Sequence, residues 1–146
     1  RSHEDISVFY RALPTYNPQM RQGFPSHSRG RKHGKAKGNT CYGSYNIDTF
    51  SKEVTTEKYP ISVLYFEKEK HPDMHPTQKP VALIQYLIRT YTNVGGCVLD
   101  NCMGSGTTAI ACIREKRNFI GFELNKEYYD KACKRIKLEM MQPSLF

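Results

Sequence analysis

The residues of this chain best suited to chemistry are a carboxylate and two closely spaced glycines. The short apolar run from Cys97 to Asp100 ends in an acidic side chain, and Gly104, Ser105 and Gly106 follow it. Glycine lets the backbone pass close to a ligand, and ligands of open α/β sheets bind beyond the carboxyl ends of the strands. We therefore predict that Asp100 and this loop shape a ligand pocket.

A second carboxylate, Glu123, ends the next apolar run, where it can accept both hydroxyls of a ribose. The glycine loop is not a phosphate-binding P-loop, because Thr107 and not Lys follows the last glycine. It also lacks the third glycine of the dinucleotide fingerprint. The combination suits an adenosine ligand without a pyrophosphate, such as S-adenosylmethionine. A tight strand-to-helix turn without a ligand is the alternative.

A third polar segment, His75-Pro-Thr-Gln-Lys-Pro80, precedes an expected helix over residues 79–91. Backbone N–H groups at a helix N-terminus, together with Lys79, favour a bound carboxylate. The methionine end of S-adenosylmethionine supplies one. Helix entry and capping alone would also explain the segment.

Alternating strands and helices must position these groups. A parallel sheet with right-handed crossovers, and hence an α/β fold, is the expected result. Asn125 is expected to cap the last helix. The composition and apolar spacing predict helices over 79–91, 107–115 and from 125 onward, and strands over 5–10, 61–66, 97–100 and 118–123.

The segment 21–58 has a different character, because it is basic, rich in glycine and poor in apolar residues. It is expected to be a loop inserted in the domain, since it has too little apolar surface to offset its ordering entropy. Either it is a solvated loop without a role, or it contacts DNA phosphates. Aromatic residues nearby favour DNA, and the candidate contacts are Arg21, Arg29, Arg31, Lys32, Lys35 and Lys37.

The overall composition fits one domain with a polyanionic partner. The chain has 146 residues and a net charge of +8, which indicates nucleic acid, although charge alone does not exclude an acidic membrane surface. No apolar stretch reaches the roughly 18 residues of a membrane span, so we expect a cytoplasmic protein without a membrane partner. Five scattered cysteines are expected to be reduced and mostly buried. No metal site is expected, because prolines follow His71 and His75.

Taken together, the segments at 75–80 and 98–108 resemble those of the DNA amino-methyltransferases that modify adenine N6 or cytosine N4. In the permuted, β-type order of that family, a His-Pro-Thr-Gln-Lys-Pro motif comes just before the glycine-rich cofactor motif. Residues 1–20 and 59–66 are also similar to the family. The resemblance is weakest over 21–58, where the family has its variable target-recognition segment.

The resemblance implies a Rossmann-like S-adenosylmethionine-dependent fold, with a mostly parallel sheet and helices on both faces. It also implies roles for single residues. The family often has an aromatic residue at the position of Cys102, so a contact of that ring is missing here. By resemblance, the methionine end is shaped by Asp100, Gly104, Ser105 and Gly106, the ribose is held by Glu123, and the pocket is closed by Thr77 and Lys79.

One family motif has no counterpart, because the chain contains no Pro-Pro pair. The family holds the flipped base with an Asp-Pro-Pro-Tyr-type motif, which lies upstream in the permuted order. We therefore expect residues 1–146 to be a partial domain, with its cofactor-binding half at 59–146 and no catalytic residue of its own. Adenine is favoured as the target of the double-stranded DNA substrate, and the chain alone is expected to be inactive without a separate or missing N-terminal segment. The alternatives are a non-catalytic remnant that binds DNA or cofactor, and an unrelated nucleotide-binding protein.

Overall fold

The computed structural model describes residues 3–26, 55–67 and 77–141. The chain divides into two compact units, one formed by residues 1–19 and 61–146 and the other by residues 20–60. Among the predicted DNA contacts, Arg29, Arg31, Lys32, Lys35 and Lys37 lie outside the described residues.

The centre of the larger unit is a pair of parallel strands, β3 (Cys97–Asp100) and β4 (Asn118–Gly121). Val98 pairs with Phe119, and the ladder continues beyond the strands because Phe122 N–H donates to the Asp100 carbonyl at 2.9 Å. Parallel strands joined by a helix are the α/β arrangement expected from the sequence, and this part of the prediction is confirmed. Both strands end at the edge where Asp100 lies.

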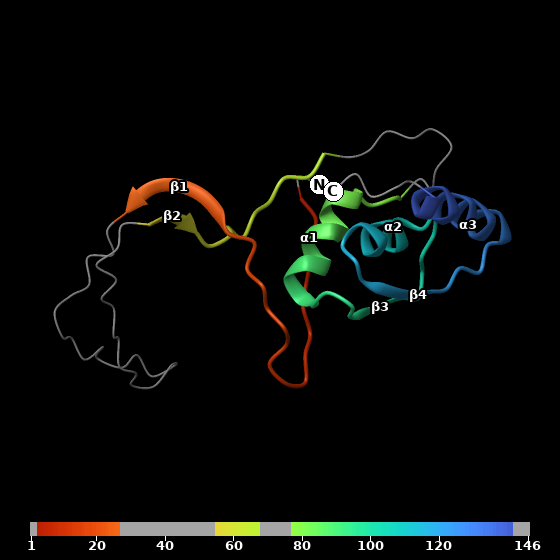
Figure 1. The fold of residues 1–146 in the computed structure, drawn as a ribbon, viewed down its shortest axis with the longest axis horizontal. Coiled ribbons are helices and arrows are strands. Elements are labelled where there is room, and N and C mark those ends of the chain that lie inside the picture. Colours follow the sequence, from red (N-terminus) through yellow and green to blue (C-terminus); the bar gives the residue numbers. More distant parts are fainter. Residues whose placement is uncertain (1–2, 27–54, 68–76, 142–146) are drawn as a thin grey trace. The chain divides into compact units, whose positions relative to one another are not determined.

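Three helices accompany these strands (Figure 1): α1 (Val81–Tyr91), α2 (Thr107–Arg114) and α3 (Lys126–Met141). The helices begin and end within two residues of the predicted limits. Apolar side chains on α1 and α2 meet in one core, against which Val98 and Phe119 pack from the strands. The buried members of this core are Val81, Ile88, Ile110, Ala111 and Cys112.

The ends of two helices have clear local causes. Asn125 Oδ1 accepts the backbone N–H groups of Glu127 and Tyr128 at 2.9 and 3.2 Å, which confirms the predicted cap of α3. Helix α2 ends just before Lys116, whose φ of 57° lies in the left-handed region that favours glycine.

Arg114 forms two hydrogen bonds to Glu139 on α3, at 2.6 and 3.0 Å. These bonds hold the pKa of Glu139 below its ordinary value.

The N-terminal segment docks on the carboxyl end of α1 through Asn17. Its backbone N–H donates to the Thr90 carbonyl at 2.7 Å, and its side-chain amide donates to the carbonyls of Arg89 and Thr92, both at 3.2 Å. These bonds satisfy carbonyl groups that have no partner within the helix. A segment distant in the sequence thereby closes α1.

The strands predicted at 5–10 and 61–66 are wrong, because both segments are described and neither contains a strand. Both segments are rich in β-branched and aromatic residues. Among the described residues, however, no other segment of the chain forms a hydrogen-bonded ladder with them. Phe9 is 92% exposed and Tyr65 is 90% exposed, so neither side chain contributes to the core. Strand propensity depends on packing against neighbouring strands, and among the described residues neither segment has a strand beside it.

The prediction of a loop over residues 21–58 is also wrong at both ends of that segment. In the smaller unit, β1 (Arg21–Ser26) pairs antiparallel with β2 (Thr55–Lys58), with Arg21 opposite Lys58. Backbone hydrogen bonds form this ladder without requiring an apolar face. The low apolar content of the segment therefore did not exclude strands.

The free cysteines are less buried than predicted. Cys112 is buried in the core, whereas Cys97, Cys102 and Cys133 are exposed. Cys41 lies outside the described residues. Burial of Cys112 raises the pKa of its thiol to about 11.

Candidate functional site

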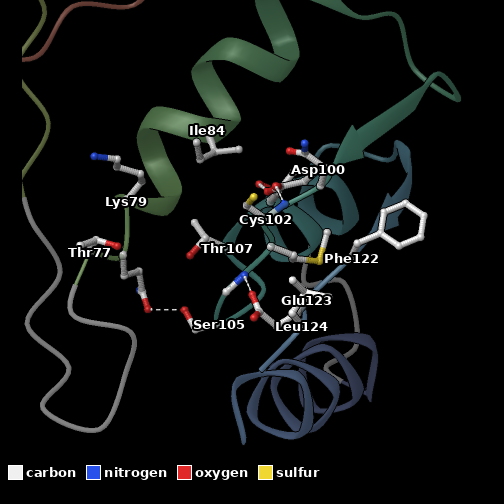
Figure 2. Close-up of a pocket in the computed structure, with 15 residues that line it drawn as sticks. Thr77, Lys79, Ile84, Asp100, Cys102, Ser105, Thr107, Phe122, Glu123 and Leu124 are labelled. Atoms are coloured by element: carbon white, nitrogen blue, oxygen red, sulfur yellow. Dashed lines mark hydrogen bonds between the residues drawn. The ribbon is translucent and has the colours of Figure 1, made fainter. Parts of the chain in front are cut away.

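A pocket of about 380 Å³ lies at the carboxyl ends of β3 and β4 (Figure 2). Its walls come from the entry to α1, the loop between β3 and α2, and the end of β4. This volume falls within the roughly 300–1,000 Å³ typical of small-molecule sites. Six of the seven predicted cofactor residues line it: Thr77, Lys79, Asp100, Gly104, Ser105 and Glu123.

Asp100 fixes the loop that follows it. One carboxylate oxygen accepts the Cys102 backbone N–H at 3.0 Å, and the other accepts the Thr108 hydroxyl at 2.5 Å. The first bond closes a tight turn after β3. The second bond ties this turn to the first turn of α2. Asp100 therefore shapes the pocket by holding its backbone.

Glu123 performs a similar task from the end of β4. Its Oε2 accepts the Gly104 backbone N–H at 2.8 Å, and its Oε1 accepts the Asn125 N–H at 2.8 Å. Each carboxylate oxygen can accept more than one hydrogen bond, so a carboxylate that holds backbone N–H groups is also able to accept from a ligand hydroxyl. The structure thus gives Glu123 a structural role that the sequence did not predict.

Gly106 begins α2 and does not line the pocket itself. Its φ of 83° is in the left-handed region, and an added Cβ would lie 3.2 Å from the Cβ of Ala132. Its N–H donates to the Met103 carbonyl at 3.0 Å. Only glycine combines this backbone conformation with such close packing against α3. The predicted effect of Gly106 on the pocket is therefore indirect, through the shape of the loop.

The entry to α1 contributes three consecutive polar side chains, Thr77, Gln78 and Lys79. Lys79 Nζ forms an ion pair with Glu4 at 2.7 Å, a partner that the sequence did not indicate. Gln78 Oε1 accepts the hydroxyl of buried Ser105 at 2.7 Å, as Figure 2 shows. This bond joins the entry of α1 to the glycine loop.

Sequence reasoning missed most of the apolar side of the pocket. Ile84 points into it from α1 in Figure 2, while Thr107 lies in the middle of the view. Ile84 also packs against the core between α1 and α2. The lining residues that were not predicted are Gln78, Ile84, Asn101, Cys102, Met103, Thr107, Thr108, Phe122 and Leu124.

The arrangement can bind a molecule that has both polar and apolar parts. Its lining combines two carboxylates, the polar residues at the entry to α1, and several apolar side chains. Among the described residues, no group of His, Cys, Asp and Glu could hold a metal ion. Within that same part of the chain, no helix is long and apolar enough to cross a membrane.

The fold and pocket define an α/β ligand-binding domain whose site lies beyond the ends of parallel strands. The model of the DNA methylase family matches residues 1–134, and the chain belongs to that family. It is 43% identical over 77 residues to the type II methyltransferase M.HpaI of Haemophilus parainfluenzae, covering 53% of this chain and 24% of that protein.

Two further proteins are similar to parts of this chain. The DNA adenine methyltransferase YhdJ of Escherichia coli is 45% identical over 62 residues, which is 42% of this chain and 21% of YhdJ. The crystal structure of the M1.HpyAVI–SAM complex is 42% identical, with a TM-score of 0.47, covering 60% of this chain and 41% of that one. The chain thus spans about a quarter of the length of the first two relatives.

Proposed function

We propose that this chain is the cofactor-binding part of an S-adenosylmethionine-dependent DNA amino-methyltransferase. The observation that carries the proposal is the joint placement of Asp100, the glycine loop and Glu123 around one pocket. Glu123 is the proposed acceptor for the ribose hydroxyls, and the apolar part of the lining suits a flat base. Thr77 and Lys79 stand at the helix entry, where a carboxylate is favoured.

When bound, the cofactor supplies an activated methyl group on a sulfonium. We propose adenine N6 as the acceptor, with cytosine N4 as the less favoured target, and a base that leaves the stack to react. The contribution of this chain is to bind and orient, and orientation supplies much of the rate of a two-reactant step. The groups that hold the target amino group are proposed to lie on another segment, because the sequence has no Pro-Pro-aromatic motif.

Double-stranded DNA is the proposed partner of the basic segment. Arg21 is exposed on β1, and its Nε donates to the Tyr59 carbonyl at 3.2 Å, which leaves other guanidinium donors for phosphate. Neutral substitution of four basic residues together, Arg29, Arg31, Lys32 and Lys35, should weaken DNA binding. Each lost phosphate contact should lower the slope of log affinity against log salt concentration by roughly 0.9. An unchanged salt dependence of DNA affinity would show that this segment does not contact the DNA phosphates. A DNA substrate also places the proposed reaction inside the cell, in the cytoplasm.

Calorimetric titration of the chain with S-adenosylmethionine and S-adenosylhomocysteine tests the cofactor proposal. We expect both to bind and an adenine nucleotide such as ATP to bind more weakly, because the pocket has no pyrophosphate loop. ATP binding as tight as that of S-adenosylmethionine would favour an unrelated nucleotide-binding protein.

Transfer of labelled methyl groups to mixed-sequence DNA tests the partial-domain proposal. We expect no transfer by the chain alone, and transfer once a segment with the Pro-Pro-aromatic motif is supplied. Robust methylation by the chain alone would contradict the proposal. Failure in both arms would favour a non-catalytic remnant.

A further inference from the structure

The side chain of Met103 lies against a glycine at the end of β4. A Cβ added at Gly121 would overlap the Sδ and Cε atoms of Met103 and would lie 3.4 Å from its Cγ. The φ angle of Gly121 is outside the left-handed region, so its backbone would accept an alanine without strain. The absence of a side chain at Gly121 therefore leaves space for Met103.

Met103 borders the pocket, and its backbone is held on both sides. It is 9% exposed and belongs to the pocket lining. Its N–H donates to the Phe122 carbonyl at 2.9 Å, and its carbonyl accepts the Gly106 N–H at 3.0 Å. Because the main chain is fixed, a collision at Gly121 must be relieved by the Met103 side chain. Methionine is unbranched and adapts its shape readily, and the pocket is the open space beside it.

A displaced Met103 side chain would enter the pocket close to Glu123. Met103 directly precedes Gly104, whose N–H donates to Glu123 Oε2 at 2.8 Å. Glu123 is the proposed acceptor for the ribose hydroxyls. A methionine side chain turned into the pocket would therefore take up space beside that carboxylate, which the nucleoside part of the ligand requires.

We propose that Gly121 is a positioning residue that sets the size of the pocket, because it keeps the Met103 side chain against β4 and out of the volume of the ligand. This inference rests on the proposed function, since it takes S-adenosylmethionine and its demethylated product as the ligands. Gly121 needs no contact with the ligand, because its effect is transmitted by Met103. The pair thus limits how large a nucleoside the site accepts.

Calorimetry with S-adenosylhomocysteine and 5′-methylthioadenosine, which share the nucleoside, tests this role. We expect Gly121→Ala to weaken both about tenfold, because the added methyl group displaces Met103 into the pocket. In a Met103→Ala background the same substitution should change both affinities less than about twofold, because no long side chain remains to be displaced.

Gly23→Ala is the matched control for the added methyl group. Gly23 lies on β1, outside the pocket lining, and its added Cβ would meet the Cγ of the flexible Lys58 side chain at 2.8 Å. We expect Gly23→Ala to bind both probes as the wild type does. Denaturant unfolding shows that each variant is folded before the affinities are compared.

A loss of affinity in Gly121→Ala that Met103→Ala suppresses supports the inference. Unchanged affinity in Gly121→Ala overturns it, and so does a loss that persists in the double variant, because Met103 then does not transmit the effect. A loss of the same size in Gly23→Ala overturns it as well.

Methyl NMR of the wild-type chain provides a measurement that does not depend on the folding of Gly121→Ala. With the methionine methyl groups labelled, the Met103 signal is identified by its absence in Met103→Ala. We expect this signal to shift when S-adenosylhomocysteine saturates the pocket, and an unmoved signal overturns the inference. A wild-type chain that binds neither probe overturns the proposed cofactor site as well, which distinguishes the two failures.

Discussion

Glu123 Oε2 accepts the backbone N–H of Gly104 at 2.8 Å. The contact joins the end of β4 to the loop after β3, across 19 residues of sequence. The other oxygen of the same carboxylate accepts the N–H of Asn125, the residue that caps α3. One side chain thus fixes both the glycine loop and the start of the last helix.

Substitution of Glu123 should therefore change folding as well as binding. We expect Glu123→Ala to lower the free energy of unfolding and the affinity for S-adenosylhomocysteine, each by about 1–3 kcal/mol. Glu123→Gln keeps one acceptor oxygen and should fall between Ala and wild type. Urea denaturation and calorimetry measure the two effects. If the affinity of Glu123→Ala were unchanged, the ribose assignment would be wrong.

Gly106 and Gly95 offer a matched pair of left-handed glycines. Their φ angles are 83° and 79°, but an added Cβ meets Ala132 at 3.2 Å only at Gly106 and nothing within 4 Å at Gly95. Gly95→Ala should cost about 1–2 kcal/mol of backbone strain. Gly106→Ala should cost more, because α3 must also move. Equal decreases in the free energy of unfolding, measured by denaturant titration, would show that the close approach to Ala132 adds no energetic cost.

Lys116 is the one described residue other than glycine with a positive φ. We expect Lys116→Gly to raise the free energy of unfolding by about 1 kcal/mol, because the left-handed strain of a side chain is removed. The same change at Lys134, which is exposed within α3, should lower it by about 1 kcal/mol. Chemical denaturation measures both changes. A lower free energy of unfolding for Lys116→Gly would contradict the presence of strain at this residue.

The buried thiol of Cys112 predicts an alkaline loss of stability. Burial raises its pKa from the ordinary 9.0 to about 11. Between these pH values the unfolded chain has released a proton that the folded chain keeps, so the free energy of unfolding falls as pH rises. Cys112→Ala should lack this part of the decline. Parallel stability curves for the two proteins from pH 8 to about 11 would contradict the prediction.

The sequence by itself determined the local elements around the site. The glycine loop, the strands that flank it and the cap at Asn125 are encoded within a few residues, and each was predicted near its observed place. A helix or a tight turn forms mostly from neighbours in the chain. Asp100, Ser105 and Glu123 could therefore be assigned to one pocket without coordinates.

Contacts between distant residues were decided only by the tertiary structure. The segments 5–10 and 61–66 have side chains typical of strands but no strand partner among the described residues, whereas β1 pairs with β2 more than 25 residues away. The pairs Glu4–Lys79 and Gln78–Ser105 likewise join separate segments at the pocket. Periodicity describes which face of an element is apolar, but not which segment will lie against it, because that depends on how the whole chain packs.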